Sequence, residues 1–241
     1  TNMKSGIIYK GPSQLDGKPI VVIATYSNRN TKTGAVVQTY ILTTENPLEA
    51  SKTGRDSTIC GSCIMRGTPT DDPKRKIAKG RRCYVNLGQG VLIVFRAFER
   101  GVYPMADSPD ARRSLGAGRF IRIGTYGDGA AVPDYVWDEL LSDADNHTGY
   151  SHQFGWRPDI AMQSADSYEE ALTHWEAGHR TFRVVADILK VDPTREVLCP
   201  ASKEAGRRVQ CADCKLCNGS ATGTRPRAYG SQPKSIAIVE H

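Results

Sequence analysis

The sequence predicts an α/β protein built on part of a (β/α) barrel, with an N-terminal β-hairpin and cysteine-rich metal-binding loops. Three observations support this prediction. Two β-branched runs separated by a turn lie near the start of the chain, and from residue 119 onward short apolar runs alternate with helical segments, as in parallel βα units. Seven cysteines fall into two groups.

The hairpin is expected within residues 1–50. The runs 20–25 and 35–42 are rich in Val, Ile and Thr, and the segment 28–34 between them has the composition of a turn. A basic, cysteine-containing loop is expected over residues 51–90. A loop of this length without periodicity is unusual inside a compact domain unless a metal organises it.

A helix is predicted from about residue 89 to residue 100, with Gly101 as its C-terminal stop. The apolar residues 91–95 cover every face of this helix, so we expect it to be buried.

The βα units are predicted over residues 119–241. A strand at 120–124 precedes a helix with Pro133 in its first turn. Ser167 and Glu170 form a capping box for another helix, which Gly178 ends. Further strands are expected at residues 148–153, 159–164, 181–186, 196–199 and 235–240. No linker divides the chain, which predicts a single α/β domain over residues 1–241.

The composition excludes several classes of protein. With 241 residues, 39% hydrophobic and 24% charged, wholesale disorder is excluded. The longest apolar run, residues 91–95, is far shorter than the ~20 residues that cross a bilayer, so no membrane partner is expected. No segment resembles a secretion signal. The sequence therefore predicts a soluble cytoplasmic protein, in the host cytoplasm if a phage encodes it.

The second cysteine group gives the strongest chemical signal. Three cysteines at C-x2-C-x2-C spacing, with a remote Cys-Pro, are typical ligands of a 4Fe–4S cluster. Zinc is the alternative metal, since structural zinc also takes four thiolates, and free buried thiols are the third interpretation. The ligands would be Cys199, Cys211, Cys214 and Cys217.

The first cysteine group offers three thiolates, Cys60, Cys63 and Cys83. Such a set leaves one metal position open to substrate, water or another side chain, as catalytic centres require. A structural zinc site completed by a histidine is an equally good interpretation. The three cysteines could also share ligands with the second group.

Polar residues recur where the predicted strands end, which is where barrel enzymes place their sites. These residues suggest a polar opening of the barrel that faces the metal site and that could bind a small-molecule ligand. The catalytic candidates are Asp128, His152, Gln153 and Arg183, and the cofactor-binding candidates are Tyr126, Ser164 and Asp166. Each also has a structural interpretation, such as a turn at Asp128 or a cap at Asp166.

Nucleic acid is a second class of partner. Six of the nine residues 74–82 are basic: Lys74, Arg75, Lys76, Lys79, Arg81 and Arg82. Such a run could bind a phosphate backbone or could be a solvated loop. Arg207, Arg208, Arg225 and Arg227 add positive charge near the other cysteines, and the net charge of +6 is compatible with nucleic acid.

Several segments together resemble a family of uncharacterised phage and prophage proteins, whose layout is similar to the radical S-adenosylmethionine superfamily. They are the CGSC at residues 60–63, CYVN at 83–86, GTYGD at 124–128, TGYSHQ at 148–153 and the CP at 199–200. The resemblance implies a partial TIM barrel, a cluster at the first cysteine group whose open iron binds the methionine end of S-adenosylmethionine, and an auxiliary cluster at the second. The superfamily's C-x3-C-x2-C triplet is absent here, which weighs against S-adenosylmethionine.

Three functions follow as hypotheses. The first is a phage-type iron–sulfur protein on a radical-SAM-like barrel, with a reaction that the sequence does not identify. The second is a zinc-stabilised nucleic-acid-binding protein. The third is a structural or host-interaction protein in which the cluster serves as a staple.

Overall fold

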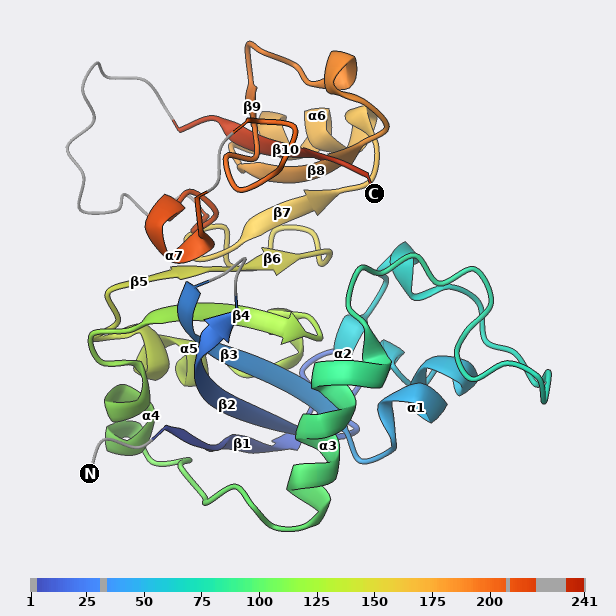
Figure 1. Cartoon of the computed structure of the whole chain (residues 1–241), viewed down its shortest axis with the longest axis vertical. Coiled ribbons are helices and arrows are strands. Elements are labelled where there is room, and N and C mark those ends of the chain that lie inside the picture. Colours follow the sequence, from blue (N-terminus) through green and yellow to red (C-terminus); the bar gives the residue numbers. More distant parts are fainter. Residues whose placement is uncertain (1–3, 31–33, 207–208, 220–232, 241) are drawn as a thin grey trace. The chain divides into compact units, whose positions relative to one another are not determined.

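The computed structural model describes residues 4–30, 34–206, 209–219 and 233–240. It divides into two compact units, residues 1–26 with 37–145 and residues 27–36 with 146–241. The described strands form two five-stranded sheets accompanied by helices (Figure 1). The mixed α/β class is therefore confirmed, while the partial barrel and the single-domain organisation stay predictions.

The first unit holds the first four strands and most of the helices. Its strands are β1 (Ser5–Pro12), β2 (Pro19–Asn30), β3 (Gly34–Thr43) and β4 (Phe120–Tyr126). Its helices and helical turns are α1 (Pro47–Thr53), α2 (Ser57–Cys60), η1 (Ile64–Arg66), η2 (Leu87–Val91), α3 (Leu92–Glu99), α4 (Pro109–Gly116), η3 (Gly129–Ala131) and α5 (Asp134–Leu141).

The strands of the first unit lie in the order β1-β2-β3-β4, so the two strands of the predicted hairpin, β2 and β3, are neighbours. β1 runs antiparallel to β2, whereas β3 and β4 are parallel. Parallel strands need a crossover between them. Here the crossover is residues 44–119, and it carries the first cysteine group together with α1, α2 and η1.

A bulge fixes the end of β4. The register between β3 and β4 shifts there: from the pair Gln38–Arg122 to the pair Tyr40–Tyr126, β3 advances by two residues and β4 by four. Gly124 lies in the bulge with φ 64°, and a Cβ at this position would lie 2.5 Å from the carbonyl oxygen of Gly127. The Thr39 hydroxyl accepts a hydrogen bond from the Gly124 amide (2.9 Å) and donates one to the Arg122 carbonyl (2.8 Å). The bulge therefore sets the direction in which the chain continues to Tyr126.

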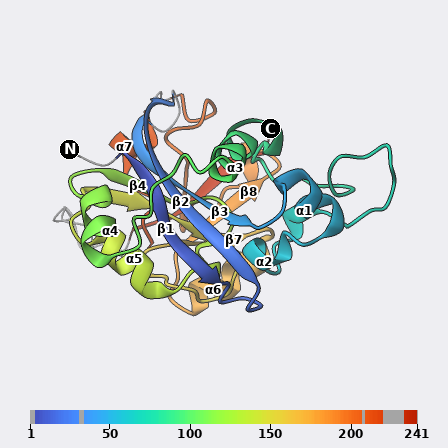
Figure 2. The same ribbon diagram turned by 90° about the horizontal axis from the view of Figure 1, so that it is seen from below.

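Two buried side chains connect elements of the first unit through hydrogen bonds. Trp137 on α5 is fully buried, and its indole N–H donates to the carbonyl of Gly129 (3.0 Å). Arg112 on α4 donates to the Ile8 carbonyl on β1 (2.7 Å) and pairs with Glu139 on α5 (2.5 Å). α4 and α5 accordingly lie side by side in both views (Figures 1 and 2).

The predicted helix over residues 89–100 is present as α3, and Gly101 follows it with φ 69°. The expectation that every face is buried is wrong. Leu92 and Phe95 are buried, but Ile93 is 66% exposed. The helix packs along one side only, and exposed single apolar residues are common on protein surfaces.

The second unit is built on parallel strands, in agreement with the predicted βα alternation. Its strands are β5 (Asn146–Thr148), β6 (Tyr150–Ser151), β7 (Met162–Ala165), β8 (Thr181–Val185), β9 (Glu196–Leu198) and β10 (Ser235–Val239). Its helices and helical turns are α6 (Tyr168–Glu176), η4 (Ile188–Lys190) and α7 (Cys211–Cys214). The sheet has the order β6-β7-β8-β10-β9, and each neighbouring pair is parallel.

The predicted cap of α6 is confirmed with one change. The Ser167 hydroxyl accepts from the Glu170 amide (3.0 Å), as a capping box requires. The Glu170 carboxylate accepts from the amide of Asp166 (2.8 Å), one residue before the usual partner. Gly178, at φ 80°, follows the helix as expected. Among the described residues, no helix has both the length and the apolar character needed to cross a bilayer.

Acid is expected to destabilise the second unit through His174. This side chain is buried and stacks on Phe154 with ring centroids 4.8 Å apart. Burial lowers the pKa of His174 below its usual 6.5; Glu170 raises it and His179 lowers it. Between the lowered folded pKa and 6.5 the unfolded chain binds more protons, so the free energy of unfolding falls as pH drops below about 6.5.

Urea unfolding followed over pH checks this expectation. His174→Gln should reduce the slope of unfolding free energy against pH below 6.5, while the lost stacking on Phe154 lowers stability by the same amount at every pH. The same slope in His174→Gln and in the wild type would contradict the assignment.

Candidate metal centres

All seven cysteines are described, and none forms a disulfide. Among the described residues, no three His, Cys, Asp or Glu side chains are grouped as a finished metal site. Each predicted cysteine group nevertheless lies within one compact unit. Two separate thiol groups therefore have to be considered, one in each unit.

The second cysteine group is anchored to the parallel sheet of its unit. Cys199 directly follows β9, and its amide donates to the Ala237 carbonyl on β10 (2.7 Å). The Cys217 carbonyl accepts from the amide of Gly149 next to β6 (3.0 Å). Between them, α7 carries two further cysteines and ends at Lys215, whose φ is 55°. Backbone hydrogen bonds thus bring both ends of the group to one sheet.

An apolar wall lies against this group. Cys199 belongs to a buried cluster with Met162 and Ile236, and Cys217 and Tyr150 pack against the same cluster. Thiols in such surroundings are protected from water and from oxidation.

The four thiols influence one another electrostatically. Burial raises the pKa of Cys217 to about 12; the hydrogen bond from Tyr150 lowers it, and the thiols of Cys199, Cys214 and Cys211 raise it. Burial also raises the pKa of Cys214, and Cys211 adds to this increase. Such influence reaches beyond the distance between ligands of one metal, so it places the four cysteines in one region of the unit without grouping them as a metal site.

Arg180 holds the chain on both sides of this cluster. Its buried guanidinium donates to the carbonyls of Leu216 (2.9 Å), Gly219 and Lys234 (2.9 Å). Residues 216–219 and the start of β10 are therefore tied to the start of β8.

A short hairpin closes the first cysteine group. Its second and third cysteines are separated by nineteen residues. The amides and carbonyls of Thr68 and Lys79 exchange two hydrogen bonds of 2.8 Å, and the Cys83 amide donates to Met65 (3.0 Å). Gly67, at φ 81°, is required where a Cβ would lie 2.6 Å from the Lys79 carbonyl. The third cysteine thus returns to the first two despite the spacing.

Arg66 fixes the turn that carries the first two cysteines. Its guanidinium pairs with the buried carboxylate of Asp56 (2.7 Å) and donates to the carbonyls of Gly54 (2.8 Å) and Gly61 (3.1 Å). Asp56 precedes α2 and Gly61 follows it, so one side chain spans the helix that ends at Cys60.

The thiols of the first group also act on one another. Burial raises the pKa of Cys60 well above its usual value, and Asp56, Cys63, Cys83 and Asp128 raise it further. The raised pKa favours the neutral thiol of Cys60.

The residues at the end of β4 lie against this group. The Asp128 amide donates to the Ile59 carbonyl of α2 (2.6 Å), and its carboxylate accepts from Ala130 (3.0 Å), so the predicted turn role of Asp128 is present. Tyr126 is 3% exposed, and its hydroxyl has no hydrogen-bond partner among the described residues. The end of β4 thus delivers two oxygen-bearing side chains to the first cysteine group.

The other predicted strand-end residues lie in the second unit. His152 Nε2 is 3.7 Å from the Asp166 carboxylate, which is an ion-pair distance and longer than the roughly 2.6–3.2 Å of direct proton transfer. The backbone N–H of Gln153 donates to the Ser151 hydroxyl (3.0 Å), and Ser164 is buried in β7. A polar mouth that combines these residues with Tyr126 and Asp128 stays a prediction.

Arg183 is held inside the sheet. Its guanidinium makes two hydrogen bonds to the carboxylate of Glu196 (2.8 and 2.6 Å) and one to the Lys190 carbonyl (2.8 Å). These contacts give the side chain a structural role, and its predicted catalytic role stays a prediction.

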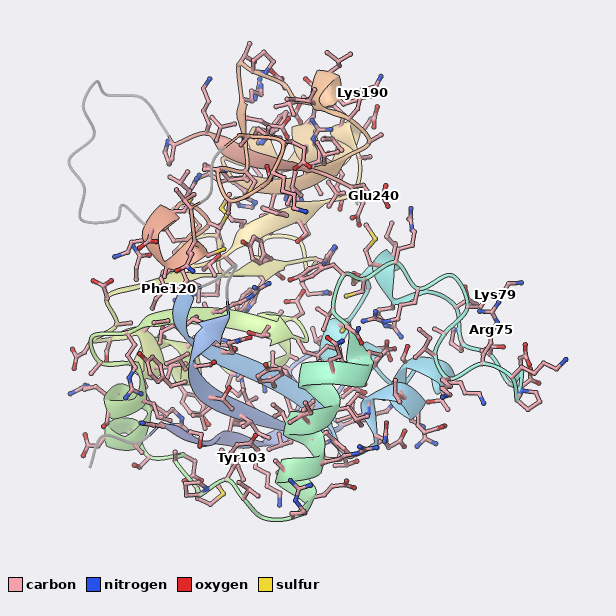
Figure 3. The ribbon with its side chains drawn as sticks, in the orientation of Figure 1. Arg75, Lys79, Tyr103, Phe120, Lys190 and Glu240 are labelled. Atoms are coloured by element: carbon pink, nitrogen blue, oxygen red, sulfur yellow. The ribbon has the colours of Figure 1, made fainter. Side chains whose placement is uncertain are left out.

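The basic run forms the outer part of the first cysteine loop. This loop projects beyond α1 in both ribbon views (Figures 1 and 2), and the side chains of Arg75 and Lys79 lie along it (Figure 3). Of its six basic residues, Arg81 alone is half-buried and donates to the carbonyl of Cys83 (2.9 Å), while the others are exposed. The other basic residues named above, Arg207, Arg208, Arg225 and Arg227, lie outside the described residues.

Sequence reasoning missed the side chains that support the two groups. Arg66, Asp56, Arg180 and Tyr150 contact cysteine-bearing segments, and of these only Tyr150 lies in a segment singled out from the sequence, the TGYSHQ at 148–153. Most of their partners are backbone carbonyls, which every residue carries. The position of Arg66 three residues after Cys63 is the one signal that could have been used.

No family model, curated protein or solved structure matches this chain.

Proposed function

We propose that this chain is an iron–sulfur protein in which Cys199, Cys211, Cys214 and Cys217 bind a 4Fe–4S cluster. The observation that carries the proposal is that backbone hydrogen bonds bring Cys199 and Cys217 to the same parallel sheet of the second unit, where both contact one apolar cluster. The soft thiolate donor set suits iron–sulfur clusters and zinc and disfavours hard cations.

The spacing favours the cluster over zinc. Cys211, Cys214 and Cys217 follow one another at intervals of three, and each could reach a different iron, while Cys199, before Pro200, supplies the remote ligand. The apolar wall beside Cys199 supports this preference, since a cluster is sensitive to solvent.

We also propose that the chain folds as a radical-SAM-like partial barrel and that it is a phage-type protein like those that its sequence resembles. The all-parallel sheet of the second unit, with α6 between β7 and β8, supports the barrel part. For catalysis, the His152–Asp166 pair is the best-supported acid–base group. A small-molecule ligand would be expected near it.

A second candidate is a zinc-stabilised nucleic-acid-binding protein. The exposed basic loop at residues 74–82 favours it, because this loop emerges directly from the first cysteine group. In this alternative, metal binding would fold the loop and the lysines and arginines would contact phosphates.

Metal analysis of the full chain purified without oxygen separates the two candidates. We expect iron and acid-labile sulfide in equal amounts, with charge-transfer absorption in the visible range. Zinc without sulfide, together with DNA binding that weakens steeply with salt, would overturn the iron–sulfur proposal in favour of the second candidate. Neither metal in stoichiometric amount would overturn both.

A further inference from the structure

We propose that the basic run at residues 74–82 and the Tyr84 ring together bind single-stranded nucleic acid, with phosphates on the lysines and arginines and one base stacked on the ring. This inference deepens the second candidate function and rests on it for the class of partner. It adds the form of the nucleic acid and the residue that contacts a base. The contacts that hold this surface are made by backbone groups and by arginine, serine and tyrosine side chains, and none of them needs a bound metal.

The first step is an exposed aromatic ring beside the positive charges. Tyr84 is 73% exposed and lies two residues after Arg82, which ends the basic run. A ring with this exposure buries little apolar surface in the free protein. Aromatic rings that bind single strands are exposed in this way, because a base has to stack on an open face.

The second step is that the ring is held in place. Arg122 on β4 donates a hydrogen bond to the Tyr84 hydroxyl (2.7 Å), and its guanidinium carbon lies 5.9 Å from the ring centroid. Arg81 donates to the carbonyls on both sides of the ring, those of Cys83 (2.9 Å) and Val85 (3.0 Å). Ring and backbone are therefore fixed before a ligand binds, which reduces the entropy lost on binding.

The third step is the charge of the run. Five of its six basic side chains are exposed: Lys74, Arg75, Lys76, Lys79 and Arg82. Asp72 lies 3.9 Å from Arg75, and both side chains are largely exposed, so this long ion pair offsets little of the charge. Such a density of positive charge attracts a phosphate backbone and releases its counterions.

The fourth step is the support of the run. Ala78 within it is 3% exposed, and its amide donates to the Ser51 hydroxyl on α1 (3.3 Å). The Thr70 amide, ahead of the run, donates to the Lys52 carbonyl of the same helix (2.9 Å). With the short hairpin that closes the loop, these contacts attach the run to α1 and so present its charges from a fixed position (Figure 3).

The fifth step is the choice between a single strand and a duplex. In a duplex the bases are stacked on one another and paired, so their faces are closed to a protein ring. In a single strand a base can leave its neighbours and stack on an aromatic side chain. The basic run would contact the phosphates of both forms, whereas the Tyr84 ring would add affinity for the single strand alone.

The test measures binding of the full chain by fluorescence anisotropy. The probes are a single-stranded DNA of mixed sequence without self-complementarity, the same sequence as RNA, and the matching DNA duplex; the two single strands distinguish the two sources of this chemistry. We expect tighter binding of a single strand than of the duplex, and weaker binding of both as salt increases. Tyr84→Leu should weaken single-strand binding roughly five- to 150-fold, the range for loss of one base stack, and leave duplex binding unchanged.

Tyr84→Phe and Tyr135→Leu are the matched controls. Tyr84→Phe loses the hydroxyl that Arg122 contacts but keeps the ring, so it should keep the single-strand affinity. Tyr135 on α5 is also exposed (49%) and also carries an arginine over its ring, at 5.2 Å. Because α5 lies away from the basic loop in both ribbon views (Figures 1 and 2), Tyr135→Leu should leave binding unchanged.

Lys79→Gln tests the electrostatic part separately. It should weaken binding of the single strand and of the duplex together. It should also reduce the slope of log affinity against log salt for the single strand by about 0.7, the value for one phosphate contact.

Two sets of results would overturn the inference. If Tyr84→Leu bound the single strand like the wild type, if Tyr84→Phe lost as much affinity as Tyr84→Leu, or if the wild type bound single strand and duplex equally, the stacking role would be wrong. Salt-dependent binding that persisted in these cases would leave the second candidate function in place. No binding of any probe would overturn both.

Discussion

Cys217→Ser is expected to abolish metal binding by the second unit and to destabilise it far more than the exchange of one sulfur for oxygen would. Metal bound to four thiolates contributes on the order of 10 kcal/mol to folding in small metal domains. The same substitution in metal-free protein should cost roughly 1–3 kcal/mol, the usual effect of one buried change.

The structure explains why Cys217 in particular should be sensitive. Its carbonyl is bonded to Gly149, its thiol receives a hydrogen bond from Tyr150, and it packs against the cluster that contains Cys199. Loss of this ligand would release the segment 216–219 that Arg180 ties to the sheet.

Thermal unfolding of metal-loaded and metal-free protein measures the effect. The difference between Cys217→Ser and the wild type should be large when metal is present and small after chelation. Cys83→Ser serves as the control, since it should leave the metal of the second unit in place. An equal difference with and without metal would show that Cys217 only packs in the core.

Several strands of the second unit could be predicted because they are short apolar runs with clear ends, whereas the strand expected at 148–153 is divided between the polar strands β5 and β6. The predicted strands at 181–186 and 235–240 correspond to β8 and β10, and Ser167 marks the start of α6 as its hydroxyl suggests. β1 was not predicted, because the apolar part of its sequence is only three residues long and glycines lie on both sides. Its burial comes from pairing with β2, which is a tertiary effect.

Of the two candidate metal centres, only the cysteines could be predicted from the sequence. The spacing divides the cysteines into two groups, and each group lies within one unit, whereas metal binding by either group stays a prediction. The closure of the first loop by Thr68 and Lys79 could not be predicted, because it consists of two backbone hydrogen bonds between polar residues. The position of Tyr126 depends on the bulge at Gly124, whose glycine was visible in the sequence but whose register was not.

The second large effect is expected for Arg183→Met. Glu196 is 2% exposed, and its carboxylate takes both of its charged hydrogen bonds from Arg183, with a further one from the Asp192 amide (2.9 Å). Removing the arginine leaves a buried carboxylate without its counter-charge. Breaking a buried ion pair from one side typically costs about 3–5 kcal/mol.

The double variant Arg183→Met/Glu196→Met separates the ion pair from the loss of packing. Replacement of both charged partners by apolar side chains of similar volume is often close to neutral, so the double variant should recover most of the stability lost by the single one. Arg113→Met is the surface control: its pair with Asp143 is long (3.7 Å) and exposed, and its loss should change the free energy of unfolding by about 0–1 kcal/mol.

Urea unfolding of the three variants also decides between two roles for Arg183. The hydrogen bond to Lys190 and the two to Glu196 join β8 to η4 and β9, so a structural role predicts that the whole edge of the sheet loosens together. A catalytic role requires instead that the guanidinium contact a substrate, and its removal would then leave stability nearly unchanged. If Arg183→Met unfolds at the same urea concentration as the wild type, the structural role is wrong and the catalytic prediction made from the sequence gains support.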